Sequence, residues 1–329
     1  MADKGLGGLA ARARLIDWVA SPGSRPHASY PRRMASLVDQ LEEVARGYLL
    51  AELPADQAAE LAQESLADLL ITIFNWRTRL IPPVPRVCHQ SAQLRASTKA
   101  TEHATALTAL IEKIEAGDDL TPHLSRAVKF AHDPKGRRDK DRLIADWGLH
   151  HLHLSGTVEA DGFVERDDDL LIAAFTPADA YIVGVYPHGS WALKELLTVI
   201  VRNWPDSGVM LKLSGIVGLE PEPTDEERLA MRNAGVAGSM ITIEGAIWSA
   251  AALGQTTAGT SSAATHRSNV VMHTLGDWRR NLPAKLANAT VNANAAAGRV
   301  VLGRWTPGIH DGVLGLHRSD LFYEIVRLD

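Results

Sequence analysis

The hydrophobic pattern of the chain changes its period near residue 148, and this change is the strongest limit on the fold. Between residues 37 and 74, apolar side chains recur at the three- and four-residue spacing of a helix. The stretch LHHLHLS, residues 149–155, instead follows the two-residue period of a strand. A chain that contains both patterns needs both kinds of element, so the sequence predicts an α+β fold.

The first predicted domain, residues 1–134, is a helical region. Three prolines in IPPVPRV, residues 81–87, interrupt it, because proline fixes φ and lacks the N–H that a helix needs. A further helix is expected over residues 102–116, where Gly117 ends it, and a short one follows over residues 121–132.

The second predicted domain, residues 135–206, is a small antiparallel sheet with a following helix. The turns EADG and PAD are short enough for antiparallel hairpins. DDLLIAAFT is apolar on both faces, as in a central strand. The helix is expected from Ser190, a good N-cap, to Trp204. The strands are expected at residues 149–154, 168–176 and 180–189.

The third predicted domain, residues 207–329, has an α+β pattern. The alanine-rich stretch 285–299 is expected to form a mobile helix or loop. The expected strands are residues 209–219, 239–253, 297–305 and 320–329, and the expected helices are residues 225–235 and 259–280.

Composition and charge favour an ordinary cytoplasmic protein. Hydrophobic residues make up 46% and charged residues 22% of the chain, and no segment approaches the roughly 18 apolar residues of a membrane span. The N-terminus does not resemble a secretory signal, and the single Cys88 fits a reducing compartment. The net charge of −5 argues against a protein that coats nucleic acid through bulk electrostatics.

A local basic patch precedes the first predicted strand. A solvated linker is one interpretation of it, and a phosphate-binding segment for RNA is the other. The patch consists of Lys135, Arg137, Arg138, Lys140 and Arg142.

Histidines are concentrated on the predicted sheet. His151 and His153 point the same way from one strand, a spacing that can place two imidazoles on one metal ion. No carboxylate stands at a diagnostic spacing from them, so no metal and no cofactor is expected, although a metal-dependent hydrolase stays open as an alternative.

Proton transfer without a metal is the second chemistry that these residues suggest. A basic groove with histidine, arginine and tyrosine can bind an RNA phosphate, accept a 2′-hydroxyl proton and protonate the leaving oxygen. The candidates are His151, His153, Arg166, Tyr186 and His188, all within 38 residues of one another.

The run from Leu143 to Leu197 resembles the sheet of the RelE-type toxin superfamily, especially its YoeB-like and HigB-like members. The resemblance rests on HHLHLSG, LLIAAFT and the closing VYPHG. It implies that Arg166 binds phosphate and that His188, beside Tyr186, transfers a proton. His151 and His153 have a looser counterpart in the middle strand of that family.

These observations lead to one expected function and one rival, beside the metal-dependent hydrolase named above as a second alternative. We expect an RNA-binding or RNA-cleaving protein, a metal-independent endoribonuclease of a toxin–antitoxin or phage-defence setting. Its expected partners are RNA or the ribosome, a protein such as an antitoxin, or further copies of the same chain, and no membrane. The rival is a non-catalytic interaction protein that uses the same sheet as a docking surface.

Overall fold

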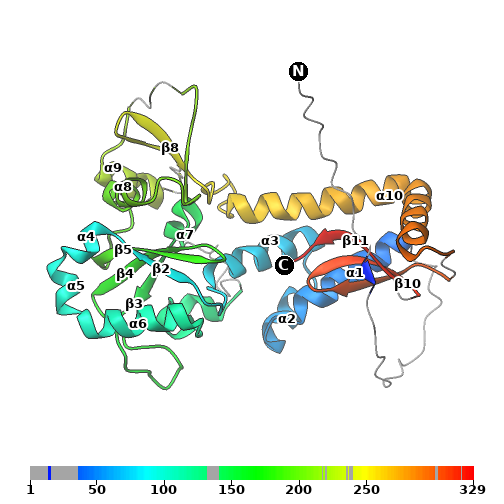
Figure 1. Cartoon of the computed structure of the whole chain (residues 1–329), viewed down its shortest axis with the longest axis horizontal. Helices are drawn as coiled ribbons and strands as arrows, with labels where there is room; N and C mark the ends of the chain where they lie inside the picture. The colour runs from blue at the N-terminus through cyan, green and yellow to red at the C-terminus, as the bar shows by residue number, and fades with distance from the viewer. Residues whose placement is uncertain are drawn as a thin grey trace. The chain divides into compact units, whose positions relative to one another are not determined.

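The fold is α+β, as the sequence predicts (Figure 1). The computed structural model describes the strand β1 (Arg14–Leu15) and then residues 36–131, 141–216, 218, 221–234, 236, 240–300, 303–319 and 321–329. None of the helices in these ranges has the length and apolar character that a bilayer crossing requires.

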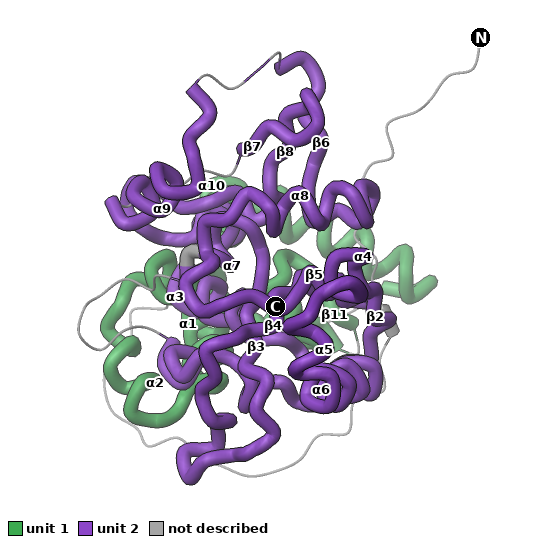
Figure 2. Tube along the Cα trace, turned by 90° about the vertical axis from the view of Figure 1, so that its left-hand side faces the viewer, with its two compact units in different colours: residues 1–70, 268–329 green, residues 71–267 purple. Residues whose placement is uncertain are grey.

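The chain divides into two compact units (Figure 2). One unit joins residues 1–70 to residues 268–329, and the other is residues 71–267. The predicted boundaries at residues 134 and 206 both fall inside the second unit, which also contains every predicted site residue.

A four-stranded sheet forms the centre of the second unit. Its order is β2-β5-β4-β3, and β3, β4 and β5 are antiparallel neighbours, as the short turns predicted. The fourth strand, β2, runs parallel to β5 and lies inside the region predicted to be helical. The prediction of a helical region was wrong for β2, because the sequence of a four-residue strand carries little information about a partner strand that is distant in the chain. The strands are β2 (Val87–Gln90), β3 (Leu149–His153), β4 (Asp169–Phe175) and β5 (Asp179–Pro187).

Both faces of this sheet are buried. On one face, Leu170 and Ile172 of β4 pack in the core that contains α8 (Lys194–Asn203) and the three-stranded sheet β6-β8-β7. On the other face, Leu171 and Ala173 pack with α6 (Ala104–Ala116). The apolar character of β4 on both sides follows from this arrangement. The smaller sheet contains β6 (Met210–Lys212), β7 (Met240–Ile243) and β8 (Ala246–Ala250).

Short helices connect these layers, and their ends follow local rules. α6 stops at Gly117, whose φ of 78° is the left-handed conformation that glycine tolerates best. α8 begins at Lys194, and its N-cap is Leu193 instead of the predicted Ser190. The remaining short segments are α4 (Ala92–Arg95), α5 (Thr98–Glu102), the 3-10 turns Thr121–His123 and Arg126–Lys129, α7 (Arg142–Trp147) and α9 (Asp225–Asn233).

The first unit combines helices with an antiparallel sheet of order β1-β11-β10-β9. α10 starts in the second unit and continues through the alanine-rich stretch, with non-helical backbone at Asn281, two residues before Pro283. The strand predicted over residues 297–305 begins later, at Thr306. Its elements are α1 (Leu37–Leu50), α2 (Ala55–Leu61), β9 (Thr306–His310), β10 (Val313–Arg318) and β11 (Leu321–Arg327), together with parts of α3 (Leu66–Arg79) and α10 (Ser262–Ala297), which continue into the second unit.

A buried ion pair joins α9 to α7. The Nε of Arg232 lies 2.8 Å from Oδ2 of Asp146, and the two side chains are only 3% and 1% exposed. The guanidinium carbon of Arg232 also lies 3.9 Å from the ring centroid of Trp147. Because α7 leads through Gly148 directly into β3, this pair helps to fix where β3 begins.

Removal of either charge should destabilise the second unit strongly. A buried charge that loses its partner costs about 3–5 kcal/mol, so Asp146→Ala and Arg232→Met should each lower the free energy of unfolding by that amount. The double variant should lose clearly less free energy of unfolding than the sum of the losses in the two single variants. Urea unfolding provides the measurement, and Arg202→Met, which breaks the exposed pair with Glu244, is the control with a loss below about 1 kcal/mol. Additive losses would show that the two charges do not stabilise each other.

Candidate functional site

Two of the predicted histidines, His151 and His188, contact one indole, and His153 lies beside His151. His151 and His153 project from the same face of β3, with ring centroids 6.3 Å apart. His188 follows β5, where its backbone N–H donates to the carbonyl of Asp168. The ring of Trp191 lies 4.9 Å from that of His151 and 5.0 Å from that of His188. We call His151, His153, His188 and Trp191 the histidine cluster.

Strand parity separates the cluster from the fourth histidine of this region. Leu149, two residues before His151, packs in the core beneath α8, so the odd-numbered positions of β3 face that side. His150 faces the opposite side, where its ring meets Phe175 edge-on at 5.4 Å. His150 and His151, which are adjacent in the sequence, therefore lie in different environments.

Burial and nearby positive charge keep two cluster imidazoles neutral. Burial first, and then the charges of Arg166, His151 and His188, lower the pKa of His153 to about 3. Burial also lowers the pKa of His151, with His188 and Arg166 acting in the same direction and Asp141 against it. At neutral pH these rings present N–H donors and lone pairs without a charge of their own.

Arg166 supplies a positive charge beside the cluster. Its Nη1 donates to the carbonyl of Leu124, its guanidinium lies 5.7 Å from the ring of Phe163, and its Nη2 has no hydrogen-bond partner among the described residues. Burial, followed by repulsion from Arg126, lowers the pKa of Arg166.

Two acidic side chains of this region, Glu159 and Asp161, are paired with other cations. Arg126 contacts both, and Lys129 also contacts Asp161. The charge of Asp161 still acts on Arg166, since it raises the pKa of that guanidinium against the effects of burial and Arg126.

Tyr186 lies on the same sheet face as the imidazoles, but its hydroxyl bonds to α8. Register places it in one cross-strand row with Leu170 and His153, with Leu170 in between. Its ring covers Gly184, and its hydroxyl lies 3.4 Å from Oε1 of Glu195 on α8. Burial and the Glu195 carboxylate raise the pKa of Tyr186, so the phenol stays protonated at neutral pH.

The basic patch cannot be placed beside the cluster. Lys135, Arg137, Arg138 and Lys140 lie outside the described residues, and Arg142 opens α7. Within the described ranges, no three histidine, cysteine or acidic side chains are arranged to hold a metal ion.

The residues that support the cluster have only weak signals in the sequence. His123 is buried, and its Nδ1 lies 2.8 Å from the carbonyl oxygen of His153 while its Nε2 lies 3.0 Å from Nζ of Lys113. Because an ammonium group can only donate, Nε2 accepts and Nδ1 donates, which fastens the end of β3. The sequence points to Trp191 only weakly, as an aromatic residue three positions after His188.

Comparison of the chain with protein-family models, with curated proteins and with solved structures found no match. The chemistry of the site is therefore inferred from its own side chains, which combine two neutral imidazoles, one exposed imidazole, an indole and a guanidinium.

The low pKa of His153 should make stability depend on pH. An unfolded histidine titrates near 6.5, so between about pH 3 and pH 6.5 the unfolded chain binds more protons than the folded one, and stability falls as the pH falls. At pH 5 the loss should be about 2 kcal/mol for this residue. Urea unfolding at pH 7 and pH 5 should show a smaller difference in His153→Gln than in the wild type.

The exposed His266 on α10 provides the control, since His266→Gln should keep the wild-type difference. An unchanged pH difference in His153→Gln would contradict the prediction.

Proposed function

We propose that the histidine cluster binds a phosphodiester of RNA and cleaves it without a metal. The observation that carries the proposal is the convergence of His151 and His188 on the ring of Trp191. The electrostatic effect of Arg166 on both strand histidines supports it further, since a guanidinium that close would also attract a phosphate.

Binding would use charge and stacking together. Arg166 provides the positive charge, and its Nη2, which is buried, has no partner within the described part of the chain. The half-buried indole of Trp191 offers an apolar ring against which a base can stack. The neutral ring of His153 would take part through hydrogen bonds, because a group with a pKa of about 3 does not carry a proton at neutral pH.

Cleavage would need one imidazole as a base and one as an acid. His151, held neutral by burial, accepts the proton of the 2′-hydroxyl, and the O2′–P bond forms. The P–O5′ bond breaks as protonated His188 gives its proton to O5′. Arg166 stabilises the charge on the non-bridging oxygens. The products are a 2′,3′-cyclic phosphate and a 5′-hydroxyl, and the two histidines end with their proton states exchanged.

The resemblance of residues 143–197 to RelE-type toxins supports the same chemistry and adds a setting. The segments that carry the resemblance lie in β3, β4 and β5, which are antiparallel neighbours, and α8 follows them. Under this proposal the substrate is RNA, free or on the ribosome, and an antitoxin protein would hold the activity in check.

Two observations favour the rival function of a non-catalytic interaction protein. Tyr186 bonds to Glu195 rather than to an imidazole, and His153 is only 6% exposed. In that function the exposed His188 and the half-buried Trp191 would contact the partner, and the histidines would have no part in proton transfer.

Cleavage of a short labelled RNA in the presence of EDTA tests the proposal. The wild type should yield fragments with cyclic phosphate ends, and a single 2′-deoxy substitution at the cleaved position should prevent the reaction. His188→Ala should slow cleavage roughly a hundredfold with little change in RNA affinity, because it removes proton transfer. Arg166→Gln should weaken binding about tenfold, because a charge-assisted contact to phosphate is lost.

Arg95→Gln is the matched control, since this exposed arginine on α4 bonds to the carbonyl of Gln90 and not to the cluster. Binding without any cleavage would favour the interaction protein, and RNA affinity that is indifferent to Arg166→Gln would contradict the proposed site.

A further inference from the structure

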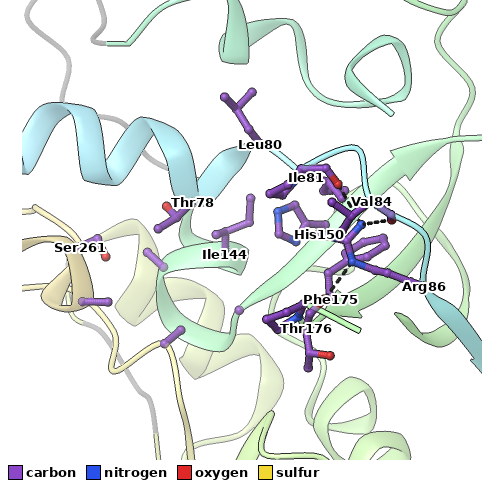
Figure 3. Close-up of a pocket in the computed structure, with 16 residues that line it drawn as sticks. Thr78, Leu80, Ile81, Val84, Arg86, Ile144, His150, Phe175, Thr176 and Ser261 are labelled. Carbon is purple, nitrogen blue, oxygen red and sulfur yellow. Dashed lines mark hydrogen bonds between the residues drawn. The ribbon is translucent and has the colours of Figure 1, made fainter. Parts of the chain in front are cut away.

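A second site lies on the other face of the same sheet. It is a cavity of about 600 Å³ within the second unit, between the end of α3, the loop after it, α7, the end of β4 and the start of α10 (Figure 3). Its walls are mostly apolar and include Ile81, Val84, Ile144 and Phe175. Cavities that hold small organic ligands typically measure about 300–1,000 Å³ and have this kind of lining. We call it the Arg86 pocket.

The pocket contains a buried positive charge. Arg86 is only 6% exposed, and its guanidinium carbon lies 5.5 Å from the ring centroid of Phe175. Nε donates to the carbonyl of Thr176, and Nη1 donates to those of Pro82 and Val84, as the dashed lines in Figure 3 show in part. Among the described residues no carboxylate pairs with it.

Such a charge is unusual in a pocket wall. Cations this deeply buried are normally matched by an anion, because carbonyl dipoles replace water but do not neutralise the charge. The Nη2 group of Arg86 has no protein hydrogen bond in the described part of the chain and remains available. A ligand with a negative group would complete the interaction.

His150 adds a second polar group to the same cavity. It is 8% exposed, and neither ring nitrogen makes a hydrogen bond of normal geometry to the described residues. Burial, followed by the nearby His151, lowers the pKa of His150 to about 4, with a weaker opposing effect from the backbone of Thr78. At neutral pH the ring is neutral and can donate one N–H to an anionic oxygen.

We infer that the Arg86 pocket binds a small monocarboxylic acid with an apolar body. The carboxylate would take hydrogen bonds from Nη2 of Arg86 and from His150, and the apolar body would lie against Ile81, Ile144 and Phe175. A dianion is disfavoured, because a single cation in an apolar wall cannot offset two charges. A neutral ligand would leave the charge of Arg86 unmatched. This inference does not rest on the proposed RNA chemistry, which uses the opposite face of β3.

Isothermal titration of the full chain with 4-phenylbutanoate and with the matching amide, 4-phenylbutanamide, tests the inference at pH 7. The two probes differ in the charge of one group, so the acid should bind about tenfold or more tightly than the amide. Equal affinities, or no binding of either probe at millimolar concentration, would overturn the inference. This comparison uses only the wild type and does not depend on whether a variant folds.

Three variants locate the binding event. Arg86→Gln should bring the affinities for acid and amide close together, and Arg86→Lys should preserve part of the preference because the charge remains. Ala263→Leu fills the cavity from the first turn of α10 and should weaken both probes while Arg86 stays in place. Arg95→Gln, on an exposed arginine outside the cavity, should change nothing. Unaltered acid binding in Ala263→Leu would place the ligand elsewhere and overturn the assignment.

Discussion

Burial of both faces of the central sheet is the constraint on which the rest of the second unit depends. Because β4 packs against a different core on each side, every position of β3 must also face one packed layer or the other. Neighbouring residues of β3 therefore lie in different environments. His150 faces the Arg86 pocket, and His151 faces Trp191. A shift of β3 by one residue would exchange the two faces, so the ion pair that anchors α7 also fixes which histidine belongs to which site.

Both faces use the same electrostatic arrangement. On each, an arginine lies near a histidine that burial has made neutral. Arg166 faces the cluster and Arg86 faces the pocket. Neutral imidazoles beside a guanidinium donate hydrogen bonds without adding to the repulsion between cations. This arrangement suits anions, which the proposals above identify as an RNA phosphate at the cluster and a small carboxylate at the pocket.

Local patterns predicted the elements better than the contacts between them. Strand β4 could be recognised as central, because it is apolar on both faces, and the end of α6 followed from Gly117. Strand β2 could not, since its parallel partner β5 is distant in sequence. Trp191 and the pair of Asp146 with Arg232 were missed for the same reason. The histidines were found from spacing alone, but their neutral state depends on burial and on arginines that only the tertiary structure brings close.

The two sites are not electrically independent, because they share β3. His151 is the second largest cause of the low pKa of His150, after burial, so a positive charge on one ring disfavours a positive charge on the other. A carboxylate held by Arg86 and His150 would place a negative charge on the other side of β3 from His151, and an added negative charge favours the protonated form of a nearby imidazole. Occupancy of the Arg86 pocket would therefore act on the histidine cluster through charge alone.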